Sequence, residues 1–164
     1  AAVVKVTTRK ENILLRTIID SGSDRNFVTL TWCKKADLQI LPISTQVIGL
    51  GNSSHKVIGL VNFTLKSLID SYQLSVCAYV VHEIVGKQPQ ITIPISSIKT
   101  FLNYPLADPN FHTPQEVDGI LGCDVFGEIL GTNQVKNDKG LPVALETRLG
   151  YLILGSIPDL FENT

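Results

Sequence analysis

The stretch Ile18-Ile19-Asp20-Ser21-Gly22-Ser23 carries the strongest signal in this chain, because an apolar run ends there abruptly in a carboxylate, a hydroxyl and a glycine. The β-branched residues before Asp20 favour a buried strand, and the small polar residues after it favour a tight turn. The triplet Asp20-Ser21-Gly22 occurs once. By itself it more often marks an ordinary surface turn than a loop that presents a carboxylate for chemistry.

A second segment, far downstream, shifts that balance. Residues 117–126 read Val-Asp-Gly-Ile-Leu-Gly-Cys-Asp-Val-Phe, so an apolar pair ends in Gly122 and leads into a predicted helix over 124–130. An Asp-Ser-Gly followed by a later apolar-apolar-Gly resembles the retropepsin-like aspartic peptidases. The resemblance implies that Asp20 is catalytic. It also implies that three downstream residues thread beside the catalytic loop and support it: Ile120, Leu121 and Gly122.

The similarity extends to a narrower group. Residues 20–28, 106–111, 118–124 and 140–151 resemble successive landmarks of the peptidase domain in polyproteins of Pao/BEL-type LTR retrotransposons, and residues 146–151 are the most specific of them. The chain departs from that family at position 24, which is Asp where Gln is expected, and at position 151, which is Tyr where Trp is usual. The resemblance implies a mainly β, retropepsin-like (acid protease) closed barrel with one or two short helices and a long insertion. It also implies cleavage of the element's own polyprotein.

Composition fits a single compact domain over residues 1–164, which the resemblance implies is a retropepsin-like peptidase domain. A hydrophobic content of 44% is enough for a core, and a formal charge of -1 argues against a surface that neutralises phosphates. No apolar run approaches the length that spans a membrane. We therefore expect no nucleic-acid partner and no membrane association. The absence of methionine suits a segment cut from a longer precursor, and the resemblance implies a cytoplasmic location within virus-like particles.

The cysteines are odd in number and widely spaced, without a Cys-x-x-Cys pair or a His at metal-ligand spacing. They indicate free thiols in a reducing compartment, and we expect neither a metal nor an organic cofactor. A catalytic Cys-His pair stays open, because such partners are close in space rather than in order. It is disfavoured because each His lies in a polar loop or at a strand end. The residues concerned are Cys33, Cys77 and Cys123 with His55, His82 and His112.

Hydrophobic periodicity predicts a series of strands and hairpins. Strands are expected over 3–8, 13–19, 27–30, 61–69, 73–81, 143–147 and 151–154. Short helices are expected over 31–38, with Thr31 near the N-cap, and over 124–130.

Residues 46–58 have strand-like ends around a small glycine-bearing tip. Such a hairpin is most often only structural, but its place in the chain favours a flap that folds over a bound peptide. Residues 83–116 contain five prolines and are interpreted as a loop-rich insertion with one short helix near 98–102.

A single Asp-Ser-Gly has a consequence for mechanism. Aspartic peptidases use two facing carboxylates that share a proton, so the second must come from a second copy of the chain. We therefore expect a two-fold homodimer with Asp20 of each subunit at the axis and an extended peptide lying across it. One Asp20 acts as general base on a water, and the protonated partner donates to the scissile carbonyl.

The neighbours of Asp20 have separate expected roles. Ser21 is expected to hydrogen-bond across the dimer axis, Gly22 to permit close backbone approach, and Ser23 to bond the outer carboxylate oxygen. Arg25 is a weaker candidate for pairing with a carboxylate near the interface. Substrate contacts are expected from Asp24, Gly49, Leu50 and Gly51.

Two further aspartates, Asp118 and Asp124, are given structural roles as a turn residue and a helix N-cap. Paired carboxylates also serve glycosidases, but the positions before a strand and at a helix start favour the simpler roles. The competing function is a catalytically silent retropepsin-like module that binds a peptide or dimerises through the same groove. The intact triplet favours the enzyme, because a binder needs no ionisable group at that position.

Overall fold

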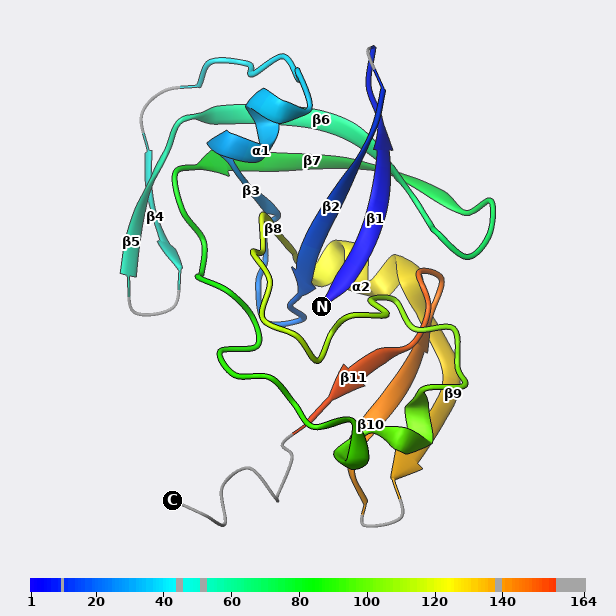
Figure 1. Ribbon diagram of the computed structural model, residues 1–164. Coiled ribbons are helices and arrows are strands. Elements are labelled where there is room, and N and C mark those ends of the chain that lie inside the picture. Colours follow the sequence, from blue (N-terminus) through cyan, green and yellow to red (C-terminus); the bar gives the residue numbers. More distant parts are fainter. Residues whose placement is uncertain (10, 44–45, 51–52, 138–139, 156–164) are drawn as a thin grey trace.

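A computed structural model describes residues 1–9, 11–43, 46–50, 53–137 and 140–155, with the backbone alone for 46–50, 53–55 and 140–141. The fold is mainly β and is centred on a closed barrel (Figure 1). Two short helices, α1 (Leu30–Lys35) and α2 (Cys123–Ile129), pack onto it. The strands follow one another around the barrel in the order β1 (Ala2–Thr7), β2 (Asn12–Ile19), β8 (Gly119–Leu121), β3 (Phe27–Thr29), β7 (Gln73–Val81) and β6 (Gly59–Lys66). The predicted fold class, a mainly β closed barrel with one or two short helices, is confirmed.

The barrel closes because alternate side chains along its strands are apolar and point inward. In β1 the buried positions are Ala2, Val4 and Val6, and in β6 the same period of two is kept by Val61, Phe63 and Leu65. The strands β1 and β6 then pair at Lys5↔Lys66 and Val6↔Leu65, which joins the ends of the sheet. Closure leaves the barrel without an exposed sheet edge.

Helix α1 covers one end of the barrel with its buried Trp32. The indole Nε1 of Trp32 donates to the carbonyl of Leu14 at 3.0 Å, and the ring meets Phe63 edge-on at a centroid distance of 5.4 Å. The predicted start of this helix is wrong. Its N-cap is Thr29, whose hydroxyl accepts from the Trp32 amide at 3.2 Å, because Thr29 has the extended backbone that a cap needs and Thr31 already lies within the helix.

Helix α2 begins directly after Gly122, which is its N-cap. The predicted N-cap role of Asp124 is therefore wrong: this residue lies inside the first turn, where a negative charge still suits the helix dipole. Asp118 lies just before β8, as predicted, and its carboxylate accepts from the hydroxyl of Thr29 at 2.9 Å.

A second sheet follows α2, with the order β11-β10-β9. Strands β10 (Gly140–Thr147) and β11 (Leu152–Leu154) match the two closing strands predicted from the sequence. The third strand, β9 (Leu130–Asn137), was not predicted. Its residues are mostly polar and exposed, so the apolar alternation that marks a strand is weak there.

The hairpin β4 (Gln46–Leu50) and β5 (Ser53–Val57) stands off the barrel on the left of Figure 1. Its strands are antiparallel, with Gly49 opposite Ser54 and Leu50 opposite Ser53. The hairpin lies within the segment interpreted as a flap. Gly51, which was predicted to contact substrate, lies outside the described residues.

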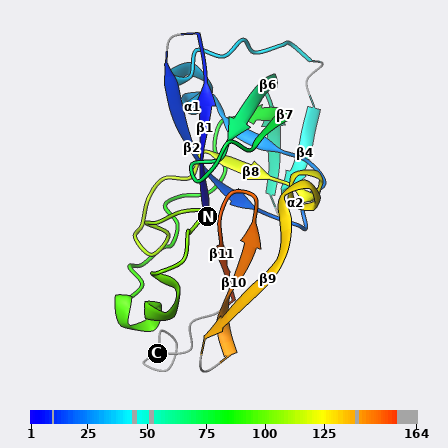
Figure 2. The same ribbon diagram turned by 90° about the vertical axis from the view of Figure 1, so that its right-hand side faces the viewer.

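The segment between β7 and β8 lies below the barrel beside the second sheet (Figure 2). It holds two short 3-10 helices, Ile95–Ser97 and Lys99–Phe101, where the sequence indicated one short helix. The segment has its own apolar cluster, in which Ile98, Phe101, Leu106 and Phe111 pack against Ala144 of β10. The insertion is thus tied to the second sheet by apolar contacts.

Candidate active site

Asp20 follows the last residue of β2, and the loop that it opens leads into β3. These two strands are separated in the barrel by β8, which runs parallel to β2 and antiparallel to β3. Ile18 lies opposite Ile120 and Ile19 opposite Leu121. The structure therefore brings the two sequence motifs together, although they are far apart along the chain.

Backbone hydrogen bonds hold the Asp20 loop in a tight turn. The amide of Asp20 donates to the carbonyl of Leu121 at 2.8 Å, and the amide of Ser23 donates to the carbonyl of Asp20 at 3.1 Å. The amide of Gly22 donates to Oδ1 of Asp20 at 2.9 Å. Asp20, Ser21 and Gly22 are all exposed. The loop thus presents an oriented carboxylate at the surface, just after a strand whose central residues Leu15, Arg16 and Thr17 are buried.

Two glycines allow this loop to lie close to its support. A Cβ on Gly22 would stand 3.3 Å from Oδ1 of Asp20, within the turn itself. A Cβ on Gly122 would stand 2.6 Å from the carbonyl oxygen of Ser23 and 2.7 Å from that of Arg25. The next amide, that of Cys123, donates to the same Ser23 carbonyl at 2.8 Å. The loop therefore rests directly on the junction of β8 and α2.

Ser23 and Arg25 stabilise the far side of the loop. The hydroxyl of Ser23 donates to the carbonyl of Arg25 at 2.7 Å, so its one proton is used within the loop and not on the Asp20 carboxylate. Arg25 Nη1 donates to the hydroxyl of Tyr79 at 2.7 Å, and the guanidinium carbon lies 5.1 Å from the ring centre. Nε of Arg25 is 4.0 Å from the exposed carboxylate of Asp24, a distance at which an ion pair contributes little.

Asn26 is a residue of the site that the sequence did not indicate. It is 5% exposed, and its Oδ1 accepts from the amide of Gly122 at 2.7 Å. Its Nδ2 donates to the carbonyl of Cys77 at 3.1 Å and to Oδ2 of Asp124 at 3.3 Å. The available signal was an amide side chain directly before the apolar pair Phe27-Val28, because a polar group at the mouth of a buried strand requires partners.

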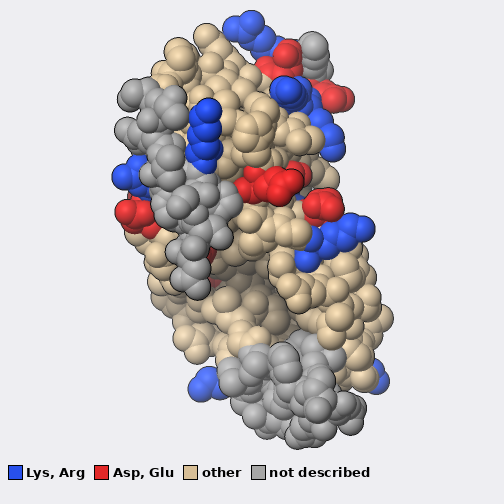
Figure 3. All heavy atoms as spheres, turned by 90° about the vertical axis from the view of Figure 1, so that its left-hand side faces the viewer, with Lys and Arg blue, Asp and Glu red and all other residues tan. Residues whose placement is uncertain are grey.

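The structure describes three of the four residues that were expected to contact substrate. Asp24 is exposed in the loop, and Gly49 and Leu50 lie in the backbone of β4, while Gly51 is outside the described residues. Figure 3 views the side of the molecule that carries the hairpin β4–β5. The surface there is hollowed near its middle, and acidic side chains lie beside the hollow.

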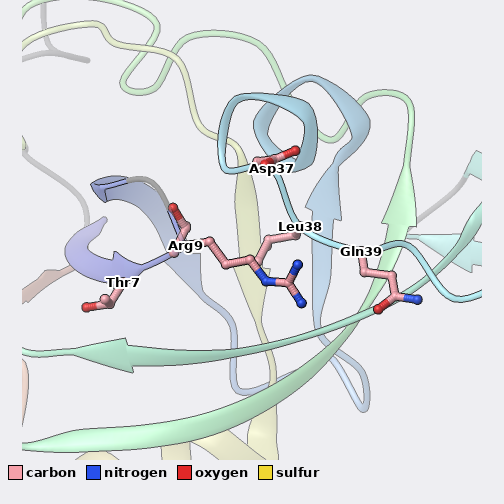
Figure 4. A pocket seen from close by; sticks show the side chains of 6 residues that line it. Thr7, Arg9, Asp37, Leu38 and Gln39 are labelled. Carbon is pink, nitrogen blue, oxygen red and sulfur yellow. The ribbon is translucent and has the colours of Figure 1, made fainter.

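A pocket of about 820 Å³ lies away from this loop, between the β1–β2 turn and the end of α1 (Figure 4). It contains no residue of the candidate site, so we assign it no part in the chemistry. Its lining residues are Thr7, Thr8, Arg9, Asp37, Leu38 and Gln39.

In the described part of the chain, no cluster of three or more His, Cys, Asp or Glu side chains is arranged to hold a metal ion. None of the described helices is long and apolar enough to cross a membrane.

Cys33 does not suit a nucleophile. It is fully buried, and burial, with a smaller contribution from the charge of Asp118, raises the pKa of its thiol from 9.0 to about 12. Cys77 and Cys123 are exposed free thiols. The Cys-His alternative therefore loses its most buried candidate.

No family model matches the chain, and no curated protein matches it significantly. Among solved structures, the crystal structure of the retroviral protease-like domain of Ddi1 from Leishmania major is similar. It shares 11% sequence identity over 94% of each chain, with a TM-score of 0.44. The fold and the site of the present chain define a closed β-barrel that presents an accessible aspartate on a loop braced by a strand threaded beneath it.

Proposed function

We propose that the chain is an aspartic endopeptidase of the retropepsin type that acts as a homodimer. One observation carries the proposal: the exposed carboxylate of Asp20 sits on a loop held by β8, which lies between the two strands that the loop connects. That loop combines an accessible acid with a rigid support. Rigid placement of a reacting group is what general acid-base chemistry requires.

The proposed reaction needs two carboxylates, and the chain offers one Asp-Ser-Gly. The second carboxylate comes from Asp20 of a partner chain across a two-fold axis. The exposure of Asp20, Ser21 and Gly22 leaves this loop accessible to such a partner. The pair shares one proton, so one Asp20 removes a proton from the attacking water while the other donates to the carbonyl oxygen.

The proposed substrate is an extended polypeptide bound across the dimer axis and covered by the hairpin β4–β5 of each subunit. Closure of such a hairpin excludes water and contributes backbone hydrogen bonds. The resemblance of residues 20–28 and 140–151 to Pao/BEL-type peptidases supports a more specific assignment. In that assignment, the substrate is the polyprotein of a retrotransposon, cleaved in the cytoplasm within virus-like particles.

The test is to incubate the purified domain with a fragment of its own precursor at mildly acidic pH. Asp20→Asn preserves the acceptor for the Gly22 amide but removes the ionisable group, and we expect it to abolish cleavage. The matched control is Asp70→Asn in the β6–β7 turn, where Oδ1 accepts from the Tyr72 amide at 2.9 Å and an amide oxygen can replace it. Cleavage that survives Asp20→Asn, or that resists a pepstatin-type inhibitor, contradicts the mechanism.

The shared site has its own test. When wild type is mixed with an equal amount of Asp20→Asn and the subunits exchange, only about a quarter of the dimers keep both carboxylates. Activity per wild-type chain should therefore fall to about half of that in the unmixed sample. An unchanged activity per wild-type chain would show that each chain is complete by itself. Saturable peptide binding without any cleavage would favour the silent binding module.

A further inference from the structure

We propose that Asn26 is a positioning residue for the Asp20 carboxylate. Its buried side chain locks the catalytic loop to the junction of β8 and α2. The effect on rate rests on the proposed peptidase function, whereas the lock itself is a property of the fold. Asn26 follows the loop and precedes β3, so it fixes the end of the loop that lies opposite Asp20.

The surroundings of Asn26 admit its amide in one orientation. Oδ1 faces a donor, the amide of Gly122 at 2.7 Å. Nδ2 faces two acceptors, the Cys77 carbonyl at 3.1 Å and the Asp124 carboxylate at 3.3 Å. A carboxamide offers an acceptor on one side and two protons on the other, which matches this set of partners. One side chain thus joins the loop to β7, to the start of α2 and to the end of β8.

Three successive residues of the support each bind the loop at a different point. The carbonyl of Leu121 accepts from Asp20, the amide of Gly122 donates to the side chain of Asn26, and the amide of Cys123 donates to the carbonyl of Ser23. The first and third bonds are made by backbone alone. The Asn26 bond is made by a side chain, so it can be altered by substitution while the backbone bonds keep their chemistry.

Loss of the Asn26 bond would let the loop shift over the Gly122 junction. The loop lies very close to this junction, because a Cβ on Gly122 would stand only 2.6 Å from the carbonyl oxygen of Ser23 and 2.7 Å from that of Arg25. A shifted loop would therefore have to lose this close packing. The reaction requires two carboxylates to meet across an axis, and a misplacement of about 1 Å at a reacting group can cost about 10²-fold in rate. We therefore expect Asn26→Ala to lower kcat by about 10²-fold and to leave KM within about threefold.

Asn26→Asp separates positioning from general stability, because it keeps the shape but changes the charge. A carboxylate at position 26 would place one oxygen against the Cys77 carbonyl and beside the charge of Asp124, and both contacts disfavour ionisation. Once protonated, the side chain can again donate to the Cys77 carbonyl. We expect the activity of Asn26→Asp to approach that of wild type at low pH and to fall as this carboxyl ionises, in a step that the wild-type profile lacks. Adding Asp124→Asn should move that step to lower pH, because the like charge that raised the pKa of the new carboxyl is removed.

The experiment measures kcat and KM against pH for wild type, Asn26→Ala, Asn26→Asp and the double variant, with the fraction folded determined for each. The control is Asn62→Asp, an exposed position on β6 opposite Cys77. A purely structural role predicts activity that follows the folded fraction, with an unshifted pH profile for Asn26→Asp, and that result would overturn the proposal. Amide hydrogen exchange at Asp20, Gly122 and Cys123 supplies a readout that needs no catalysis. Faster exchange in folded Asn26→Ala supports the lock even if wild type cleaves nothing, and unchanged exchange rejects it.

Discussion

Arg16 donates from Nε to Oδ2 of Asp108 at 2.7 Å, and this contact joins residues 92 positions apart. Both side chains are buried, at 8% and 1% exposure. Nη1 of Arg16 also donates to the carbonyls of Gln88 and Gln115, at 2.6 and 2.8 Å. One residue of β2, the strand that leads into the Asp20 loop, therefore binds the insertion at three points.

Asp108→Asn should destabilise the fold strongly, because it leaves a buried guanidinium without its counter-charge. Breaking a buried pair by removing one partner costs about 3 to 5 kcal/mol, so we expect the free energy of unfolding in urea to fall by about 3 kcal/mol. The matched control is Asp24→Asn, which removes the exposed contact with Arg25. It should change stability by less than about 0.5 kcal/mol. Equal effects of the two substitutions on the free energy of unfolding would show that the buried Arg16–Asp108 ion pair stabilises the fold no more than the exposed contact does.

Gly122→Ala tests the contact between the loop and its support. The added Cβ would meet the carbonyls of Ser23 and Arg25 at 2.6 and 2.7 Å, and backbone atoms cannot swing aside as a side chain can. Forced overpacking typically costs about 1 to 3 kcal/mol, and here it would also displace the Asp20 loop. We expect reduced stability in urea and loss of peptidase activity.

Gly127→Ala in α2 is the control for that substitution. A Cβ at Gly127 meets nothing within 4 Å, so Ala should stabilise the helix by about 0.5 to 1 kcal/mol through its better helix propensity. Similar losses at the two glycines would refute the steric explanation. A stable Gly122→Ala protein with full activity would show that the loop does not need this close contact.

The barrel could be predicted from the sequence because its determinants are local. The period of two in β1 and β6, and the abrupt end of β2 at Asp20, are visible within a few residues. Strand β9 escaped prediction because it is mostly polar and exposed, so its place depends on pairing with β10. Local pattern shows a strand only where burial acts on alternate residues.

The candidate site also contains residues that the sequence could indicate and residues that it could not. Asp20 and Gly122 lie in recognisable motifs, whereas Asn26 acts through partners 51, 96 and 98 positions away along the chain. No spacing rule connects such residues, because their contacts exist only once β8 lies between β2 and β3. The cap of α1 was missed for a related reason, since Thr29 also serves β3 and binds Asp118.

The thiols should differ sharply in reactivity. Cys33 is fully buried with a pKa raised to about 12, while Cys77 and Cys123 are exposed. Because the thiolate is the reactive form, iodoacetamide should modify the two exposed cysteines in the native protein and reach Cys33 only on unfolding. Mass spectrometry of peptides after timed labelling measures this order, and early labelling of Cys33 would contradict the packing around α1.

The same buried thiol should lower stability in alkaline solution. Burial raises the pKa of Cys33 from 9.0 to about 12, so above pH 9 the unfolded chain releases a proton that the folded chain retains. The unfolded state then binds fewer protons, and the free energy of unfolding falls as pH rises from 9 towards 12, by up to about 1.4 kcal/mol per pH unit. Cys33→Ala removes this contribution while the titrations of lysines and tyrosines stay common to both proteins. Urea unfolding at a series of pH values should therefore give a steeper decline for wild type than for Cys33→Ala, and parallel curves would show that the thiol ionises freely in the folded state.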